Sequence, residues 1–326
     1  MPVSRAPRAP LSAIAAAQQA VELVGQRLFP FRLERWLPLG FVAFLDSCGR
    51  GGAGVQFPGG GGGGGGGETG AGGSGGGPDI EQARDWVLEH LVVIVAVAVV
   101  GLLLVLTIMA IVLWINSRGV FMYVDNVATG RFEIKRPWHE HADRAWSYFK
   151  WSFGLTLATF VGVLLLLVPL GFLVFTLIRD GASCAPIGGL VVTILLIIAF
   201  ALAMGLVGML LRDFAAPLQI ALGVSAGEAL GVTWGLVRSS PLTFLAYLLL
   251  KIVFTILTAF AAILAGCLTC CIGFLPVISH TILQPLLYFE RAWSLFILRQ
   301  AGYDLFPAPP PLPPPAASPE YAPLPG

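Results

Sequence analysis

Residues 91–115 read LVVIVAVAVVGLLLVLTIMAIVLWI, an unbroken apolar run. At about 1.5 Å per residue, a helix of this length exceeds the ~30 Å hydrocarbon thickness of a bilayer. Four further apolar runs follow, over residues 151–178, 187–211, 242–265 and 268–288. A chain that is 56% hydrophobic and 11% charged, arranged in such blocks, is typical of an integral membrane protein. The sequence therefore predicts an all-α, polytopic transmembrane helical bundle with five spans.

The chain before these spans contains a shorter apolar segment and an amphipathic stretch. Residues 37–45 are too few to cross a bilayer unaided at ~1.5 Å per residue. Residues 11–28 place apolar side chains at Leu11, Ile14, Val21, Val24 and Leu28, which favours a helix lying in the membrane interface. We expect interfacial helices of this kind between the spans as well.

Low-complexity segments divide the chain into four parts. Residues 1–48 hold the amphipathic helix and the short segment, and residues 49–78 form a glycine-rich linker with nine consecutive glycines. Residues 79–302 are the predicted transmembrane helical domain, opened by Asp79 as a helix cap. Residues 303–326 are a proline-rich tail that we expect to be extended and disordered.

The distribution of Lys and Arg predicts the topology. If residues 37–45 cross the membrane, the six-pass chain divides its basic residues 15 to 3 between the two sides, excluding Lys251. If they do not cross, the division is 10 to 8. The positive-inside rule favours the six-pass arrangement, with both termini in the cytoplasm. Segment length argues the other way, unless flanking residues extend the helix or the bilayer thins locally.

Aromatic and basic residues at the ends of the spans are typical of membrane-interface anchors. A similar Arg, Phe and Trp pattern after the first and third spans hints at an internal duplication. The predicted anchors are Arg32, Trp36, Arg118, Trp138, Trp146, Trp234 and Arg238.

Three polar residues lie at predicted membrane depth. An ammonium group such as that of Lys251 costs a few kcal/mol there unless it snorkels or finds a partner. Snorkelling is the simpler interpretation, and a substrate or ion contact is the functional one. His280 and Gln284 are four residues apart in the last span, so we expect them to share a helix face. Glu290 and Arg291 follow that span and are expected to be solvated.

Neither a metal site nor a cofactor site is predicted. His139 and His141 are two residues apart, which differs from the four-residue spacing of helical zinc ligands. Cys267, Cys270 and Cys271 lack a fourth ligand nearby, so we expect these thiols to pack as small hydrophobic groups in a turn at Gly266 and Cys267.

Four short motifs carry a resemblance to known membrane proteins: Arg32-x-x-x-Trp36-x-x-Leu39-Gly40-Phe41, Arg118-Gly119-x-Phe121 with Asp125-Asn126, Asp213-Phe214-x-x-Pro217, and Pro285-x-x-x-Phe289-x-Arg291. With them the chain resembles an uncharacterised family of bacterial multi-pass membrane proteins. More distantly, it resembles the membrane domain of some bacterial glycerophosphodiester phosphodiesterases. The catalytic barrel of those enzymes and its metal ligands have no counterpart here. The resemblance thus implies a fold and a location in the bacterial cytoplasmic membrane, without catalytic residues.

These observations favour a non-enzymatic, membrane-organising or accessory protein whose partners are membrane lipids. A net charge of +1 argues against nucleic-acid binding. The alternative is a transporter or lipid-translocating protein that uses Lys251, His280 and Gln284. A lipid-modifying enzyme would have only Asp125, His139, His141 and Asp213 to work with, so we expect no enzymatic activity.

Overall fold

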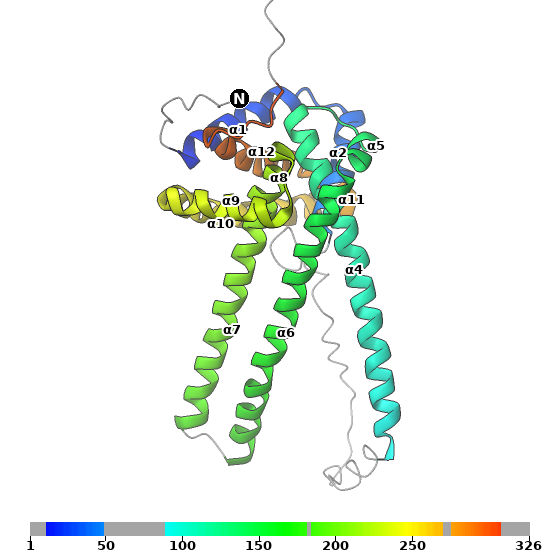
Figure 1. Ribbon diagram of the computed structural model, residues 1–326, viewed down its shortest axis with the longest axis vertical. Coiled ribbons are helices and arrows are strands. Elements are labelled where there is room, and N and C mark those ends of the chain that lie inside the picture. The colour runs from blue at the N-terminus through cyan, green and yellow to red at the C-terminus, as the bar shows by residue number, and fades with distance from the viewer. Residues whose placement is uncertain (1–10, 49–88, 181–183, 270–274, 308–326) are drawn as a thin grey trace, which may run out of the picture.

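The computed structural model describes residues 11–48, 89–180, 184–269 and 275–307, and every regular element in these ranges is helical. Figure 1 shows three long helices, α4, α6 and α7, that extend to the same side of a cluster formed by the other helices. We call residues 91–112, 151–180 and 184–209 the stalk. We call residues 11–48, 113–150, 210–251 and 275–307 the head. The predicted all-α fold is confirmed.

Helix α4 (Leu91–Thr129) belongs to both parts. Its first buried side chain is Leu113, so its stalk half exposes apolar groups while its head half is buried. The exposed half spans about 33 Å at ~1.5 Å per residue, which matches the hydrocarbon thickness of a bilayer. The helix ends at Gly130, whose φ of 69° is the left-handed conformation that glycine adopts without steric cost.

Helices α6 (Ala142–Asp180) and α7 (Cys184–Leu210) form the rest of the stalk and pack against each other. A Cβ added to Gly162 would lie 2.3 Å from Cζ of Phe200, so this glycine permits the close contact. Four stretches of the described residues are long and apolar enough to cross a membrane: Leu91–Thr129, Ala142–Leu177, Ile187–Leu222 and Pro241–Leu268.

The fourth of these, α10 (Pro241–Leu268), packs against α1, α9 and α11, and Figure 1 draws it at the level of the head. Its buried residues form one stripe, and most of its other apolar side chains are exposed. Gly266 and Cys267 lie inside this helix, so the turn predicted at these residues is wrong. The buried stripe includes Phe244, Tyr247, Lys251 and Thr258.

The predicted fifth span over residues 268–288 is not one helix. The chain forms α11 (Pro276–Ile282), breaks at Leu283 and continues as α12 (Gln284–Gln300). A proline stands in the first turn of each helix, where its missing N–H costs nothing but where it cannot continue a preceding helix. Helix α12 then packs into the head.

The short N-terminal segment forms α2 (Leu33–Ser47), which packs against α4 and α11. Two glycines permit these contacts. A Cβ on Gly119 of α4 would lie 2.4 Å from the backbone carbon of Leu45, and a Cβ on Gly40 would lie 2.9 Å from Cα of Thr281. Membrane crossing by residues 37–45 stays a prediction.

Helix α1 (Ala13–Leu28) lies on α12. The side chain of Ser12 caps its N-terminus by accepting from the N–H of Ala15. The buried face is formed mainly by Ala13, Ala16 and Ala20, whereas Ile14 and Val21 of the predicted apolar face are exposed. The helix is therefore as predicted, but small residues make its contact with the head.

The remaining helices complete the head. They are α5 (Lys135–Glu140), the π-helical turn η1 (Leu211–Ala215), α8 (Ala216–Leu222) and α9 (Ala226–Ser239). The predicted cap at Asp79, the glycine-rich linker and all but the first residues of the proline-rich tail lie outside the described residues.

Candidate functional site

Six charged side chains meet inside the head, at the point where α2, η1, α10 and α12 converge. Three are carboxylates and three are cations, so their formal charges cancel. We call this group the ion network. Its members are Asp46, Arg212, Asp213, Lys251, Glu290 and Arg291.

Asp46 occupies one end of the network and is 1% exposed. Nη2 of Arg291 donates to its Oδ1 and Oδ2 at 2.9 and 2.8 Å. Arg212 also binds both oxygens, with Nε 3.2 Å from Oδ1 and Nη2 paired with Oδ2. One carboxylate thus links α2 to η1 and α12, and such charge-assisted bonds are the strong class of hydrogen bond.

Asp213 and Glu290 surround Lys251 at the other end. Nζ of Lys251 pairs with Oδ2 of Asp213 and lies 3.1 Å from Oε1 of Glu290. The hydroxyl of Tyr247 donates to the same Asp213 oxygen at 3.0 Å. Nη1 of Arg212 lies 3.2 Å from Asp213 and 3.3 Å from Glu290, which joins the two ends.

The π-helical turn η1 contributes two consecutive residues to the network, as the α-helix α12 does with Glu290 and Arg291. The wider turn over Leu211–Ala215 leaves all five of its residues buried, including Arg212 and Asp213. Such bulges occur frequently at functional sites.

The structure thus gives Lys251 carboxylate partners. Such partners offset the free-energy cost of an ammonium group at membrane depth. The expectation of solvated Glu290 and Arg291 is wrong for Arg291, which is 2% exposed, and Glu290 is also largely enclosed. Asp46 was not singled out by the sequence analysis at all. The available signal was its place directly after the apolar residues 37–45.

His280 and Gln284 do not share a helix face. The break at Leu283 puts His280 on α11 and Gln284 at the start of α12. The His280 ring contacts Phe44 of α2, with 5.7 Å between the ring centroids, while Nε2 of Gln284 donates to the hydroxyl of Tyr123 at 2.9 Å. The network and these residues are neighbours in the head but do not form one constellation.

Of the predicted interfacial anchors, four form exposed or partly exposed cation–aromatic groups. The guanidinium of Arg118 lies 5.7 Å from the ring of Trp114 and 5.6 Å from that of Trp138. Arg238 lies 5.2 Å from the ring of Trp234. These distances are those of cation–π contacts.

The other three predicted anchors differ among themselves. Trp146 is 49% exposed and stacks on Phe149. Arg32 is exposed at the start of α2. Trp36 is only 7% exposed and donates its indole N–H to the carbonyl of Leu28 at 3.1 Å, so it joins α1 to α2 instead of facing the interface.

A second polar group surrounds Asp125 near α5. Arg136 Nη2 lies 2.5 Å from Asp125, and Arg136 also pairs with Glu133 and Glu140. Although burial alone favours the neutral guanidine, these carboxylates raise the pKa of Arg136. His141 Nε2 lies 3.5 Å from Asp125 Oδ1. Arg136 thus supplies the positive charge that the three carboxylates share.

Neither the two histidines nor Cys267 belongs to a metal-ligating group within the described residues. His141 is buried, whereas His139 is exposed, and no group of three metal-ligating residues occurs among the described ranges. Cys267 is exposed in the chain alone, and its packing as a small hydrophobic group stays a prediction. Cys270 and Cys271 lie outside the described residues.

The motifs that carry the resemblance converge on the head. Gly40 and Gly119 form its close helix contacts, and Asp213 and Arg291 belong to the ion network. A model for the "Family of unknown function (DUF7544)" matches residues 11–303, a range that includes the head and the stalk. No curated protein and no solved structure matches the chain.

Proposed function

We propose that this chain, which belongs to the DUF7544 family of unknown function, is a non-enzymatic membrane protein that organises lipids or accessory partners around its head. The proposal includes its location in the bacterial cytoplasmic membrane, with the head and both termini on the cytoplasmic side. In this arrangement the stalk lies in the hydrocarbon, and the head lies at the adjacent interface except for residues 37–45, which are proposed to cross the membrane.

The ion network is the observation that supports a structural role for the head. Its three carboxylates and three cations bind one another, and Tyr247 adds a further donor. Removing charges from water is costly, and mutual pairing offsets the cost only when most donors and acceptors are satisfied. Nε of Arg291 lacks a hydrogen bond, but the other contacts of the network join four elements to one another, which supports a rigid head.

The distribution of basic residues supports the cytoplasmic placement of the head. Among the described residues, Arg179 is the basic residue at the far ends of the stalk helices, while the others lie in the head. Basic residues on the head include Arg118, Arg131, Lys135 and Lys150. By the positive-inside rule such a surface faces the cytoplasm.

A turnover assay tests the absence of catalysis. The purified full-length chain is incubated in liposomes of bacterial polar lipids, and intact lipids and released head groups are quantified by mass spectrometry. We expect no difference from protein-free liposomes. Formation of free head group or lysolipid that is lost in Asp213→Asn would overturn the proposal and assign chemistry to the ion network.

The alternative is lipid translocation. The observation that favours it is Gln219, which is fully buried in the head with neither amide atom hydrogen-bonded among the described residues. An unsatisfied buried amide is a polar contact available to a moving head group. Scrambling of a fluorescent phospholipid in proteoliposomes, abolished by Gln219→Leu and Lys251→Met but not by Glu22→Ala, would favour translocation over the structural role.

A further inference from the structure

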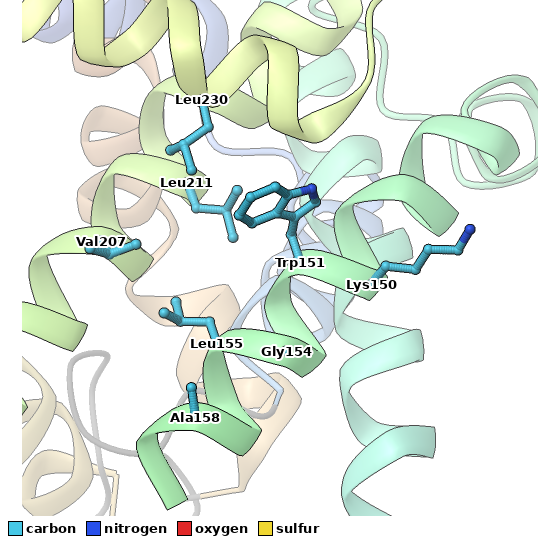
Figure 2. A pocket seen from close by; sticks show the side chains of 8 residues that line it. All are labelled: Lys150, Trp151, Gly154, Leu155, Ala158, Val207, Leu211 and Leu230. Carbon is cyan, nitrogen blue, oxygen red and sulfur yellow. The ribbon is translucent and has the colours of Figure 1, made fainter. Parts of the chain in front are cut away.

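A hollow opens at the junction of head and stalk, between α6, α7 and α9. Its volume is about 340 Å³, and Figure 2 shows the side chains that line it. Nearly all of them are apolar. The lining residues are Lys150, Trp151, Gly154, Leu155, Ala158, Val207, Leu211 and Leu230.

Small residues on α6 create the space. Gly154 and Ala158 are four residues apart and therefore lie on one helix face. A Cβ added to Gly154 would meet no atom within 4 Å. The hollow follows the seam between α6 and α7, whose stalk halves expose apolar side chains. In a membrane its opening faces acyl chains.

The upper edge of the hollow is amphipathic. Trp151 projects toward Leu211 in Figure 2, and its indole also packs on α9, where a Cβ on Gly227 would lie 3.1 Å from the ring. The ammonium of Lys150 is turned away from the other labelled side chains. The aliphatic part of Lys150 therefore lines the space while its charge lies at the rim.

Lys150 is the unneutralised cation at this rim. It makes no ion pair within the described residues, and its ammonium lies 5.7 Å from the ring of Trp146. The nearest carboxylate on the first turn of α9, Glu228, accepts the N–H of Ser225 at 3.0 Å as part of a capping box. The ammonium thus lies beside the half-exposed indole of Trp146, at the edge of a largely apolar space.

We propose that the hollow binds an anionic phospholipid, with one acyl chain along the α6–α7 seam and the phosphate beside Lys150. The charge at the rim suits the anionic phosphate of such a lipid, and the apolar lining below it suits the acyl chain. This inference rests on the proposed function, because it names the lipid class that the head organises.

The test is native mass spectrometry of the detergent-purified full chain titrated with phosphatidylglycerol or phosphatidylcholine of identical acyl chains. We expect the first bound phosphatidylglycerol to be favoured about fivefold, as one lysine near an anionic head group allows. Lys150→Gln should abolish that preference and leave phosphatidylcholine binding unchanged. Lys135→Gln, which changes an exposed lysine of α5, is the matched control.

Gly154→Leu tests the apolar half of the site. It should fill the hollow and weaken binding of both lipids, whereas Gly171→Leu, at an equally open position farther along α6, should not. Circular dichroism and gel filtration verify that each variant is folded. Inorganic phosphate should compete only weakly, and strong competition would identify a free-anion site instead of a lipid site.

Besides strong competition by phosphate, two results would overturn the inference. One is an unchanged phosphatidylglycerol preference in Lys150→Gln, and the other is equal binding by Gly154→Leu and wild type. Either result without lipid turnover would leave the proposed function intact. Turnover of a lipid head group would instead contradict the proposed function, whatever the result of the lipid-binding assay.

Discussion

The head and the stalk belong to one chain but differ in how their polar groups are hydrogen-bonded. In the stalk, helices such as α4 expose Val and Leu side chains on nearly all sides and satisfy their backbone groups internally. In the head, helices from distant parts of the sequence bury charged and polar side chains against each other. The comparison indicates that the stalk needs lipid as its partner, whereas the head supplies its own.

Polar groups in the two regions bond differently. In the stalk, the hydroxyl of Thr107 donates to the carbonyl of Leu103 in its own helix. In the head, Asn116 of α4 donates to the carbonyls of Leu45 and Asp46 of α2 at 3.2 and 2.6 Å. Burial also raises the pKa of Tyr288 to about 12, so its hydroxyl stays protonated and donates to Val127. Polar substitutions should therefore affect the head more than the stalk.

The largest effect is expected for Asp46→Ala. It leaves Arg212 and Arg291 buried without the carboxylate that binds both, and breaking a buried pair costs about 3–5 kcal/mol. The measurement is the thermal midpoint of the protein in detergent. Glu22→Ala, at an exposed carboxylate on α1, is the control and should change little. Equal midpoints for the two variants would contradict a stabilising network.

A steric comparison comes next, between two glycines of the same helix. Gly119→Ala places a methyl group against the backbone of α2 and should cost about 1–3 kcal/mol, as overpacking does. Gly101→Ala, in the stalk, meets open space and should be neutral or slightly stabilising. Chemical denaturation in detergent micelles measures both. Destabilisation by Gly101→Ala would mean that this part of α4 is packed against protein.

Asn126 offers a hydrogen-bonding comparison of intermediate size. Its side chain donates to the carbonyl of Glu133 at 2.9 Å and accepts the N–H of Glu133 at 3.1 Å, which fixes the loop after α4. Asn126→Ala should cost about 1–3 kcal/mol because two hydrogen bonds, each worth about 0.5–1.5 kcal/mol, are lost. Thr107→Val in the stalk should lower the free energy of unfolding by at most a few tenths of a kcal/mol. Thermal midpoints of the two variants decide whether the difference holds.

Arg136→Gln should have the smallest effect. Its three carboxylate partners are Asp125, Glu133 and Glu140, but its side chain is 33% exposed, so solvent screens the pairs. We expect a loss of about 1 kcal/mol or less that shrinks further in high salt. A salt-independent loss as large as that of Asp46→Ala would indicate that this group is as enclosed as the ion network.

Hydropathy alone predicted the parts of the fold that depend on lipid. The spans containing α4, α6 and α7 follow from runs of apolar residues, because their partner is a solvent of uniform character. The same signal failed for residues 268–288, where Pro276 and Pro285 begin two separate helices. Hydropathy also gave no sign that α10 would lie at the level of the head.

The candidate site was less accessible from the sequence, because its members come from four separate elements. Lys251 attracted attention through its apolar neighbours, but its partners Asp213 and Glu290 lie 38 and 39 residues away in the chain. Arg212 and Asp213 lie in a π-helical turn, which has no sequence signature of its own. Local sequence patterns therefore drew attention to Lys251 but did not predict which residues pair with it.

Carbene photolabelling from a lipid-soluble diazirine in proteoliposomes tests the division between head and stalk most directly. It uses the unmodified chain, and peptide mass spectrometry locates the label. We predict strong labelling over residues 91–112 and 151–177 and little over residues 113–129 of the same α4 helix. Uniform labelling along α4, or labelling concentrated within residues 113–129, would contradict a lipid-facing stalk joined to a self-packed head.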